Sequence, residues 1–233
     1  MARSAGTYFY YPFAFLVLEQ QFLCAVYPGS SDATSATSYA ECSAAEICHL
    51  QDTDPSYNDF KVDTNYKYYL DNWFIEMDLK CMTTAAIGFM VTAYYIGFAI
   101  GGLFFGFPDK YGRKKSLILG LAISCIAQTV VITSSNYWVR FAMFGLSGLS
   151  QIKNSVSYVW LSECTSQPFK SQAFTFINIF DAMPMAITCL YFMFVSKHWV
   201  YLSLFFCVLS YLALAAAFFC PESPRWLLIK GNS

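Results

Sequence analysis

The stretch PDKYGRKKS, from Pro108 to Ser116, is a short basic loop between two long apolar segments. The stretch PESPRWLL, from Pro221 to Leu228, follows the last apolar segment. Positively charged side chains concentrate in these loops and their neighbours, at Lys110, Arg113, Lys114, Lys115, Lys170, Arg225 and Lys230. Because Lys and Arg in short loops stay on the inner side of a membrane, the two stretches predict a chain that crosses a membrane repeatedly and keeps both of them inside.

The composition is that of a membrane protein. Hydrophobic residues make up 57% of the chain and charged residues only 12%, with 23 Phe and 17 Tyr. A soluble domain averages about 25% charged residues, so the membrane class is the direct interpretation. The net charge of −1 gives no basic surface for nucleic acid, and no secretory leader or transit peptide is expected.

Six segments reach the length of about 20 mostly apolar residues that a spanning helix needs. They are Thr7–Tyr27, Thr83–Phe107, Ser116–Ser134, Tyr137–Leu161, Ala173–Ser196 and Trp199–Phe219. A polar insert, Pro28 to Lys80, separates the first two and holds ten acidic residues and three Lys. The insert shows no strand or long-helix periodicity, so we expect a small Tyr-rich cap. The loop charges place both termini inside and the insert outside.

The basic loop resembles the loop between the second and third helices of the major facilitator superfamily, and PESPRWLL resembles a signature of its sugar-porter and organic-cation-carrier branches. The end of the insert, YYLDNWFIEMDLKC, is similar to the end of the ectodomain of organic-cation carriers. The resemblance implies an all-α membrane fold over residues 1–233, half of a transporter bundle, with six helices in two inverted repeats and the insert at residues 28–80. It also implies a charge network at the inner ends of the helices, in which Arg113 binds Glu163, made of Asp109, Gly112, Arg113, Glu163, Glu222 and Arg225.

Polar residues inside the apolar segments are candidates for function, because ionisable groups at membrane depth are rare. The fourth segment carries a polar stripe at helical spacing, and Lys153 is expected to pair with Asp181 on the fifth. The stripe either lines a central cavity or holds helices together. The candidate residues are Glu19, Gln20, Ser150, Gln151, Lys153, Asn154, Ser157 and Asp181.

Four cysteines, Cys24, Cys42, Cys48 and Cys81, lie in or beside the insert. They allow three full pairings, and we expect Cys81 to be linked to one of the other three. No spacing of His and Cys fits a metal site, and no cofactor is expected. In the second segment, the pairs Gly97/Gly101 and Gly102/Gly106 predict a face for close helix packing.

Two classes of function follow. Since the chain ends after one half-bundle, we favour a transporter-derived accessory or structural subunit of a larger membrane complex. The alternative is a solute carrier, of organic-ion or sugar type, whose second half comes from another copy or chain. Partners would be lipids, other membrane subunits or a second half, and a small solute; no catalytic motif indicates an enzyme. The insert has no N-x-[ST] sequon, which favours an organelle, first the mitochondrial inner membrane and then the plasma membrane, with both termini on the matrix or cytoplasmic side.

Overall fold

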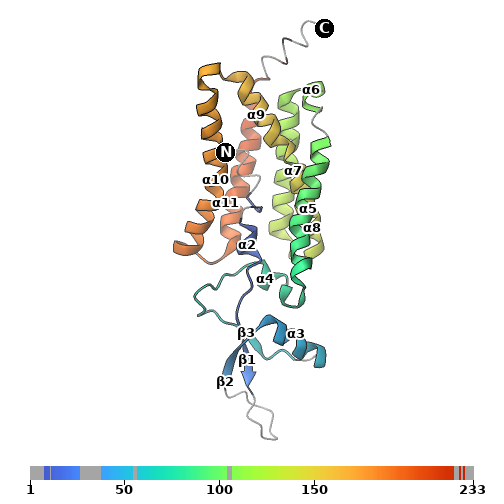
Figure 1. Ribbon diagram of the computed structural model, residues 1–233, viewed down its shortest axis with the longest axis vertical. Coiled ribbons are helices and arrows are strands. Elements are labelled where there is room, and N and C mark those ends of the chain that lie inside the picture. The colour runs from blue at the N-terminus through green and yellow to red at the C-terminus, as the bar shows by residue number, and fades with distance from the viewer. Residues whose placement is uncertain are drawn as a thin grey trace.

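The computed structural model describes residues 8–10, 12–26, 38–54, 57–103, 107–222, 226 and 228. Long helices form an elongated bundle, and the insert projects from one end of it (Figure 1). We call that end of the bundle the insert end. The opposite end, which carries the short helix α6 (Phe107–Tyr111) and the basic loop after it, is the basic end.

Four helices are long and apolar enough to cross a membrane among the described residues. They are α5 (Thr84–Leu103), α7 (Arg113–Thr133), α10 (Lys170–Phe194, preceded by a 3-10 turn, Gln167–Phe169) and α11 (Trp199–Phe219). A helix of 20 residues, such as α5, is about 30 Å long, which matches the hydrocarbon core of a bilayer. The second, third, fifth and sixth predicted spans are therefore confirmed as helices.

The fourth predicted span is broken into α8 (Tyr137–Leu149) and α9 (Ile152–Cys164). At the break the backbone N–H groups of Gln151, Lys153 and Asn154 bond to the carbonyl three residues back, as in a 3-10 helix. The cause is local. The Ser147 carbonyl accepts the Ser150 hydroxyl at 2.6 Å and the Gln151 amide at 3.2 Å. Such side-chain bonds compete with the regular helical ladder.

The prediction of a first span over Thr7–Tyr27 is wrong for the residues that are described there. The helix α2 covers only Phe13–Leu16, and the strand β1 begins at Phe22 and ends at Val26. Between them the Gln20 side chain accepts the Leu70 N–H at 2.9 Å. A bond to a residue 50 positions along the chain replaces helical continuation, so six spans in two three-helix repeats are not confirmed.

The insert contains regular structure that the sequence did not indicate. Strand β1 lies between β2 (Ser38–Cys42) and β3 (Phe60–Val62), both antiparallel to it. Helix α3 (Ala44–Thr53) follows β2 and begins with a capping box, in which Ser43 and Glu46 satisfy each other's backbone N–H groups. A short helix, α4 (Trp73–Glu76), then connects the insert to the bundle.

Helices α5 and α8 cross at very short distance. A Cβ on Gly97 would lie 1.9 Å from the Gly145 carbonyl oxygen, and one on Gly148 would lie 1.9 Å from the Tyr94 carbonyl oxygen. Gly101 also faces α8, where a Cβ would lie 2.9 Å from the Leu149 carbonyl oxygen. The packing face predicted at Gly97 and Gly101 is confirmed. Gly106 lies outside the described residues.

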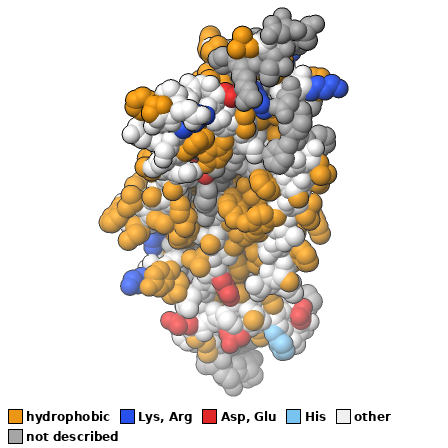
Figure 2. Space-filling model, turned by 45° about the horizontal axis from the view of Figure 1, so that its top comes forward, with side chains coloured by type: hydrophobic (Ala, Val, Ile, Leu, Met, Phe, Trp, Pro, Cys, Tyr) orange, Lys and Arg blue, Asp and Glu red, His pale blue; other side chains and the backbone are white. Residues whose placement is uncertain are grey.

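Many large apolar side chains of the bundle are exposed, and they gather in patches on the face that Figure 2 shows. Of the four long helices, α10 is the least buried within the chain. The largest buried cluster lies instead near the insert end, around Trp73, where Phe9, Phe144, Trp199 and Phe206 also belong. The apolar exterior suits lipid or another protein.

Candidate functional site

At the basic end, Arg113 and Glu163 come together from the start of α7 and the end of α9. Arg113 Nη2 lies 3.4 Å from Glu163 Oε1, and the two side chains are 16% and 6% exposed. Because both side chains are shielded from water, loss of either one would leave an uncompensated buried charge, which is strongly unfavourable. The contact has the geometry that the sequence predicts, and its role in latching helix ends stays a prediction.

Gly112 and Glu222 form the second part of this network. Gly112 has a φ of +107°, which favours glycine, and a Cβ there would lie 3.1 Å from Glu222 Oε1. The same oxygen accepts the Lys114 N–H at 2.9 Å, so Glu222 caps the first turn of α7 from the end of α11. Lys114 Nζ donates to the Phe218 carbonyl at 2.7 Å.

Two residues predicted for the network are not placed in it. Asp109 belongs to α6, and its side chain lies outside the described part of the structure, as does Arg225. The described network therefore joins α7 to the ends of α9 and α11. In terms of the predicted spans, it connects the loop after the second span to the inner ends of the fourth and sixth spans.

The polar stripe of the fourth predicted span coincides with the break between α8 and α9. Ser150 and Gln151 are buried and bond to the backbone of their own helix. Lys153 is fully buried, and its ammonium donates to Ser150 Oγ at 3.0 Å. A Cβ on Gly120 would lie 2.9 Å from Lys153 Cβ, so the root of the Lys153 side chain packs against α7.

The predicted pairing of Lys153 with Asp181 stays a prediction. Asp181 is half-buried on α10, and the Cβ of Lys153 packs against Gly120 of α7. The 3-10 turns at the break advance the helix by about 120° per residue and not 100°. Side chains after the break are therefore rotated from the positions that a continuous helix predicts.

A second polar group lies where α9 and α10 face each other. The Tyr158 hydroxyl donates to the Asn178 amide oxygen at 2.5 Å, and the hydroxyl of the adjacent Ser157 donates to the Lys153 carbonyl of its own helix at 2.7 Å. Asn154 donates to Gln151 Oε1 at 2.5 Å. Asp181 lies one turn beyond Asn178, near the middle of α10. These side chains form the shared polar face of α9 and α10.

Glu19 and Gln20 lie at the insert end and not at mid-depth. Glu19 is exposed and Gln20 is buried, in the connection between α2 and β1. They line a cleft of about 510 Å³ together with Glu41, Glu46 and Tyr66 of the insert. The prediction that Glu19 is an intramembrane acid is wrong, because the apolar run before it does not continue as a helix. No group of three or more His, Cys, Asp or Glu side chains in the described chain could hold a metal ion.

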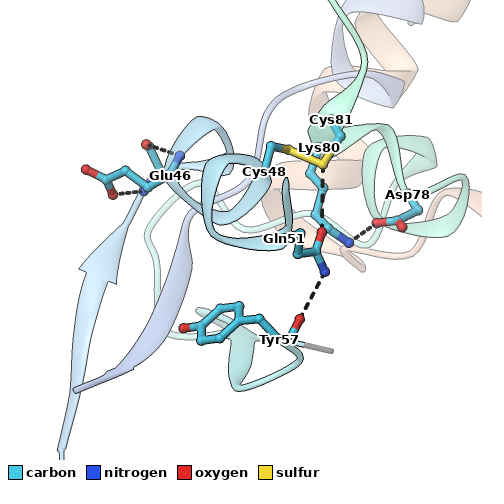
Figure 3. The surroundings of a disulfide bond; sticks show 8 residues. Glu46, Cys48, Gln51, Tyr57, Asp78, Lys80 and Cys81 are labelled. Atoms are coloured by element: carbon cyan, nitrogen blue, oxygen red, sulfur yellow. Dashed lines mark hydrogen bonds and ion pairs between the residues drawn. A yellow bond between two sulfur atoms is a disulfide. The ribbon is translucent and has the colours of Figure 1, made fainter. Parts of the chain in front are cut away.

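Disulfides link the four candidate cysteines. Cys48 of α3 is bonded to Cys81, just before α5, and Cys24 of β1 is bonded to Cys42 of β2. Figure 3 shows the first of these, with Gln51 donating to the Tyr57 carbonyl at 3.2 Å beside it. This pairing is consistent with the expected link from Cys81 to the insert, which sequence reasoning left open among three partners.

Sequence reasoning missed Arg140, which is fully buried in α8. Its guanidinium lies over the rings of Trp73 and Trp199, at 4.8 and 5.1 Å from their centroids. Nη2 of Arg140 lies 2.5 Å from Glu76 Oε1. The sequence did contain a signal for this site. Arg140 follows Tyr137-Trp-Val in an apolar segment, and a charged side chain inside such a segment requires a partner.

Comparisons with known proteins identify relatives of the chain. A family model described as "Sugar (and other) transporter" matches residues 7–233. Organic cation/carnitine transporter 6 of Arabidopsis thaliana is 30% identical over 169 residues, which cover 67% of this chain and 31% of the relative. Organic cation/carnitine transporter 2 of Rattus norvegicus is 28% identical, with 72% and 30% covered.

Among solved structures, the partially occluded inward-open conformation of the xylose transporter XylE from E. coli matches with a TM-score of 0.55 and 17% identity, over 99% of this chain and 50% of that one. A D-xylose–proton symporter matches with a TM-score of 0.54 and 18% identity. At this identity the likeness shows the fold. The chain spans about a third of the length of the curated relatives that it matches and about half of the solved transporters.

Proposed function

Because the chain belongs to the sugar (and other) transporter family, within the major facilitator superfamily, we propose that it forms one half of the helical bundle of a solute carrier. In this proposal the shared polar face of α9 and α10 lines the solute path. A second half-bundle, from further chain, a second copy or another protein, covers that face. A single half-bundle over residues 1–233, with an outer insert at 28–80, belongs to the same proposal.

The observation that carries this proposal is the polar face on the least buried long helix. Asn178 is exposed and Asp181 half-buried in the chain, and both lie on α10. Polar groups that face hydrocarbon are costly, so they face water, a solute or protein. Tyr158 and Ser157 on α9 extend the same face. A water-filled path between two halves would accommodate the exposed Asn178 and the half-buried Asp181.

The solute class that this face supports best is a small organic cation. Asp181 is the acidic residue of this face, and a carboxylate attracts a cation. The Tyr158 ring supplies an aromatic surface for the same charge. The named relatives include organic cation/carnitine transporters, which is consistent with this class. In the proposal the network of Arg113, Glu163 and Glu222 holds the basic end together while the solute passes.

The proposed host is the plasma membrane, with the basic end and both termini on the cytoplasmic side. Two disulfides link cysteines in the insert to cysteines beside it, and disulfides persist on the side of a membrane that faces an oxidising compartment. The basic loop supports the opposite side as the inner one. The mitochondrial inner membrane, with the basic end in the matrix, remains the second hypothesis.

The test is the reaction of a cysteine on the polar face with a membrane-impermeant thiol reagent. Ser157→Cys is expressed in intact membranes, in a background where the free Cys164, Cys189 and Cys220 are replaced by Ser. We expect labelling at least about tenfold faster than for Leu212→Cys, an exposed apolar position on α11. We expect tetraethylammonium, a small organic cation, to slow the labelling of Ser157→Cys by occupying the path. A tenfold change in affinity corresponds to about 1.4 kcal/mol of binding free energy.

A matched pair of carboxylate variants completes the experiment. Asp181→Asn should abolish the protection by tetraethylammonium, whereas Glu19→Gln, at the insert end, should leave it intact. Equal labelling of Ser157→Cys and Leu212→Cys would reject a solute path and support the accessory-subunit function. Fast labelling without protection by any organic cation or sugar would reject the carrier as well.

A further inference from the structure

Residues 70–76, with the sequence LDNWFIE, connect the insert to the bundle, and we call them the strap. Asn72 is fully buried. Its side-chain amide donates to the carbonyls of Phe15 and Leu18, at 3.0 and 2.9 Å. Carbonyls at the end of a short helix need such partners, so the strap ends α2 by supplying them.

The strap also holds the start of α11. The Asp71 N–H donates to the Lys197 carbonyl at 3.1 Å, and the Trp199 N–H donates to the Asp71 carbonyl at 3.4 Å. The Asp71 carboxylate lies 2.5 Å from His198 Nδ1. The first backbone N–H of α11, which has no partner within its own helix, is therefore satisfied by the strap.

Arg140 of α8 joins these contacts into one unit. Its guanidinium contacts the rings of both Trp73 of the strap and Trp199 of α11, while Glu76 of the strap binds Nη2. Nε of Arg140 donates to the Ser134 carbonyl at 2.6 Å. A single buried cation thus contacts the strap and α11 from α8.

We propose that the strap and Arg140 form a clasp that makes the insert, α2, α8 and α11 move as one body at the insert end. Glu76 is the carboxylate that binds Arg140, and it comes from the strap, so the charge is compensated only while the strap is docked. Undocking would leave a buried guanidinium without its counter-ion, which is strongly unfavourable. The clasp itself does not depend on the proposed transport.

The test is hydrogen exchange of the full chain in detergent, compared with Glu76→Gln. If the clasp exists, peptides over residues 66–79, 137–144 and 199–206 exchange faster together, by about tenfold. The reason is that the substitution leaves the buried Arg140 without its counter-ion. Peptides over α7 and the middle of α5 should exchange as before. The matched control is Asp78→Asn, which removes the carboxylate that binds Lys80 two residues away (Figure 3), and it should change none of the three segments.

Acceleration in residues 66–79 alone would overturn the proposal, because Glu76 would then hold only its own segment. Equal acceleration of all helices would overturn it too, as general destabilisation. If Glu76→Gln does not fold, Glu76→Asp takes its place under the same criterion, since it retains the charge and shortens the reach by one methylene. The proposed function can fail without affecting this result, because no solute is used.

Discussion

Lys153 is fully buried beside α7. Its position depends on Ser150 and Gln151, whose side chains compete for the Ser147 carbonyl and tighten the helix there. The polar stripe was visible in the sequence, but the rotation that it causes was not. Sequence reasoning named the residues of the charge network, because a motif carries them, and missed the partner of a lone charge such as Arg140.

Gly112 offers a sharp test at the residue scale. We expect Gly112→Ala to destabilise the chain by about 1–3 kcal/mol, because a φ of +107° is strained for alanine and its Cβ would press on Glu222. The measurement is thermal unfolding in detergent. Gly88→Ala is the control, since nothing lies within 4 Å of a Cβ there. Equal melting temperatures for the two variants would show that Glu222 does not cap α7 through this turn.

Apolar length predicts an element well when its hydrogen bonds are local. Helices α5, α7, α10 and α11 satisfy their backbones internally, so runs of about 20 apolar residues were sufficient to find them. Residues 22–26 are equally apolar, but they pair with β2 and β3. That pairing depends on partners far along the chain, which a window of local sequence does not contain.

The crossing of α5 and α8 tests packing between elements. Gly148→Ala should destabilise the chain by about 3 kcal/mol, at the upper end of overpacking costs, because the new Cβ would lie 1.9 Å from the Tyr94 carbonyl oxygen. Gly145→Ala, one turn earlier on the same helix, should be tolerated, since its nearest atom would be 3.5 Å away. Thermal unfolding of the two variants compares them directly. If both unfold at the wild-type temperature, the helices are further apart than described.

At the scale of the whole molecule, the insert and the bundle share their stability. The cluster around Trp73 contains residues from both, and the Cys48–Cys81 disulfide joins α3 to the chain just before α5. The basic end is held separately by Arg113 and Glu163. The two ends of the molecule therefore have independent ties, one mainly covalent and aromatic and one ionic.

The double substitution Cys48→Ser and Cys81→Ser tests the covalent tie. In the chain-entropy model, loss of a link across a sequence separation of 33 residues costs about 3–4 kcal/mol. The pair Cys24→Ser and Cys42→Ser, with a separation of 18, should cost about 0.5 kcal/mol less by the same model. Thermal unfolding without reductant measures both. A variant pair that melts like the parent would mean that these thiols are not linked in the protein.

The antiparallel sheet of the insert has a practical consequence for imaging. A chain of 26.3 kDa whose bundle is surrounded by detergent has few features outside the micelle for the alignment of particle images in electron microscopy. Strand β2 is an edge of the sheet and is largely exposed, so it offers a surface for an antibody fragment outside the micelle. Because the strap and the disulfides fix that surface to the bundle, such a fragment would serve as a fiducial, and its orientation would report the tilt of the helices.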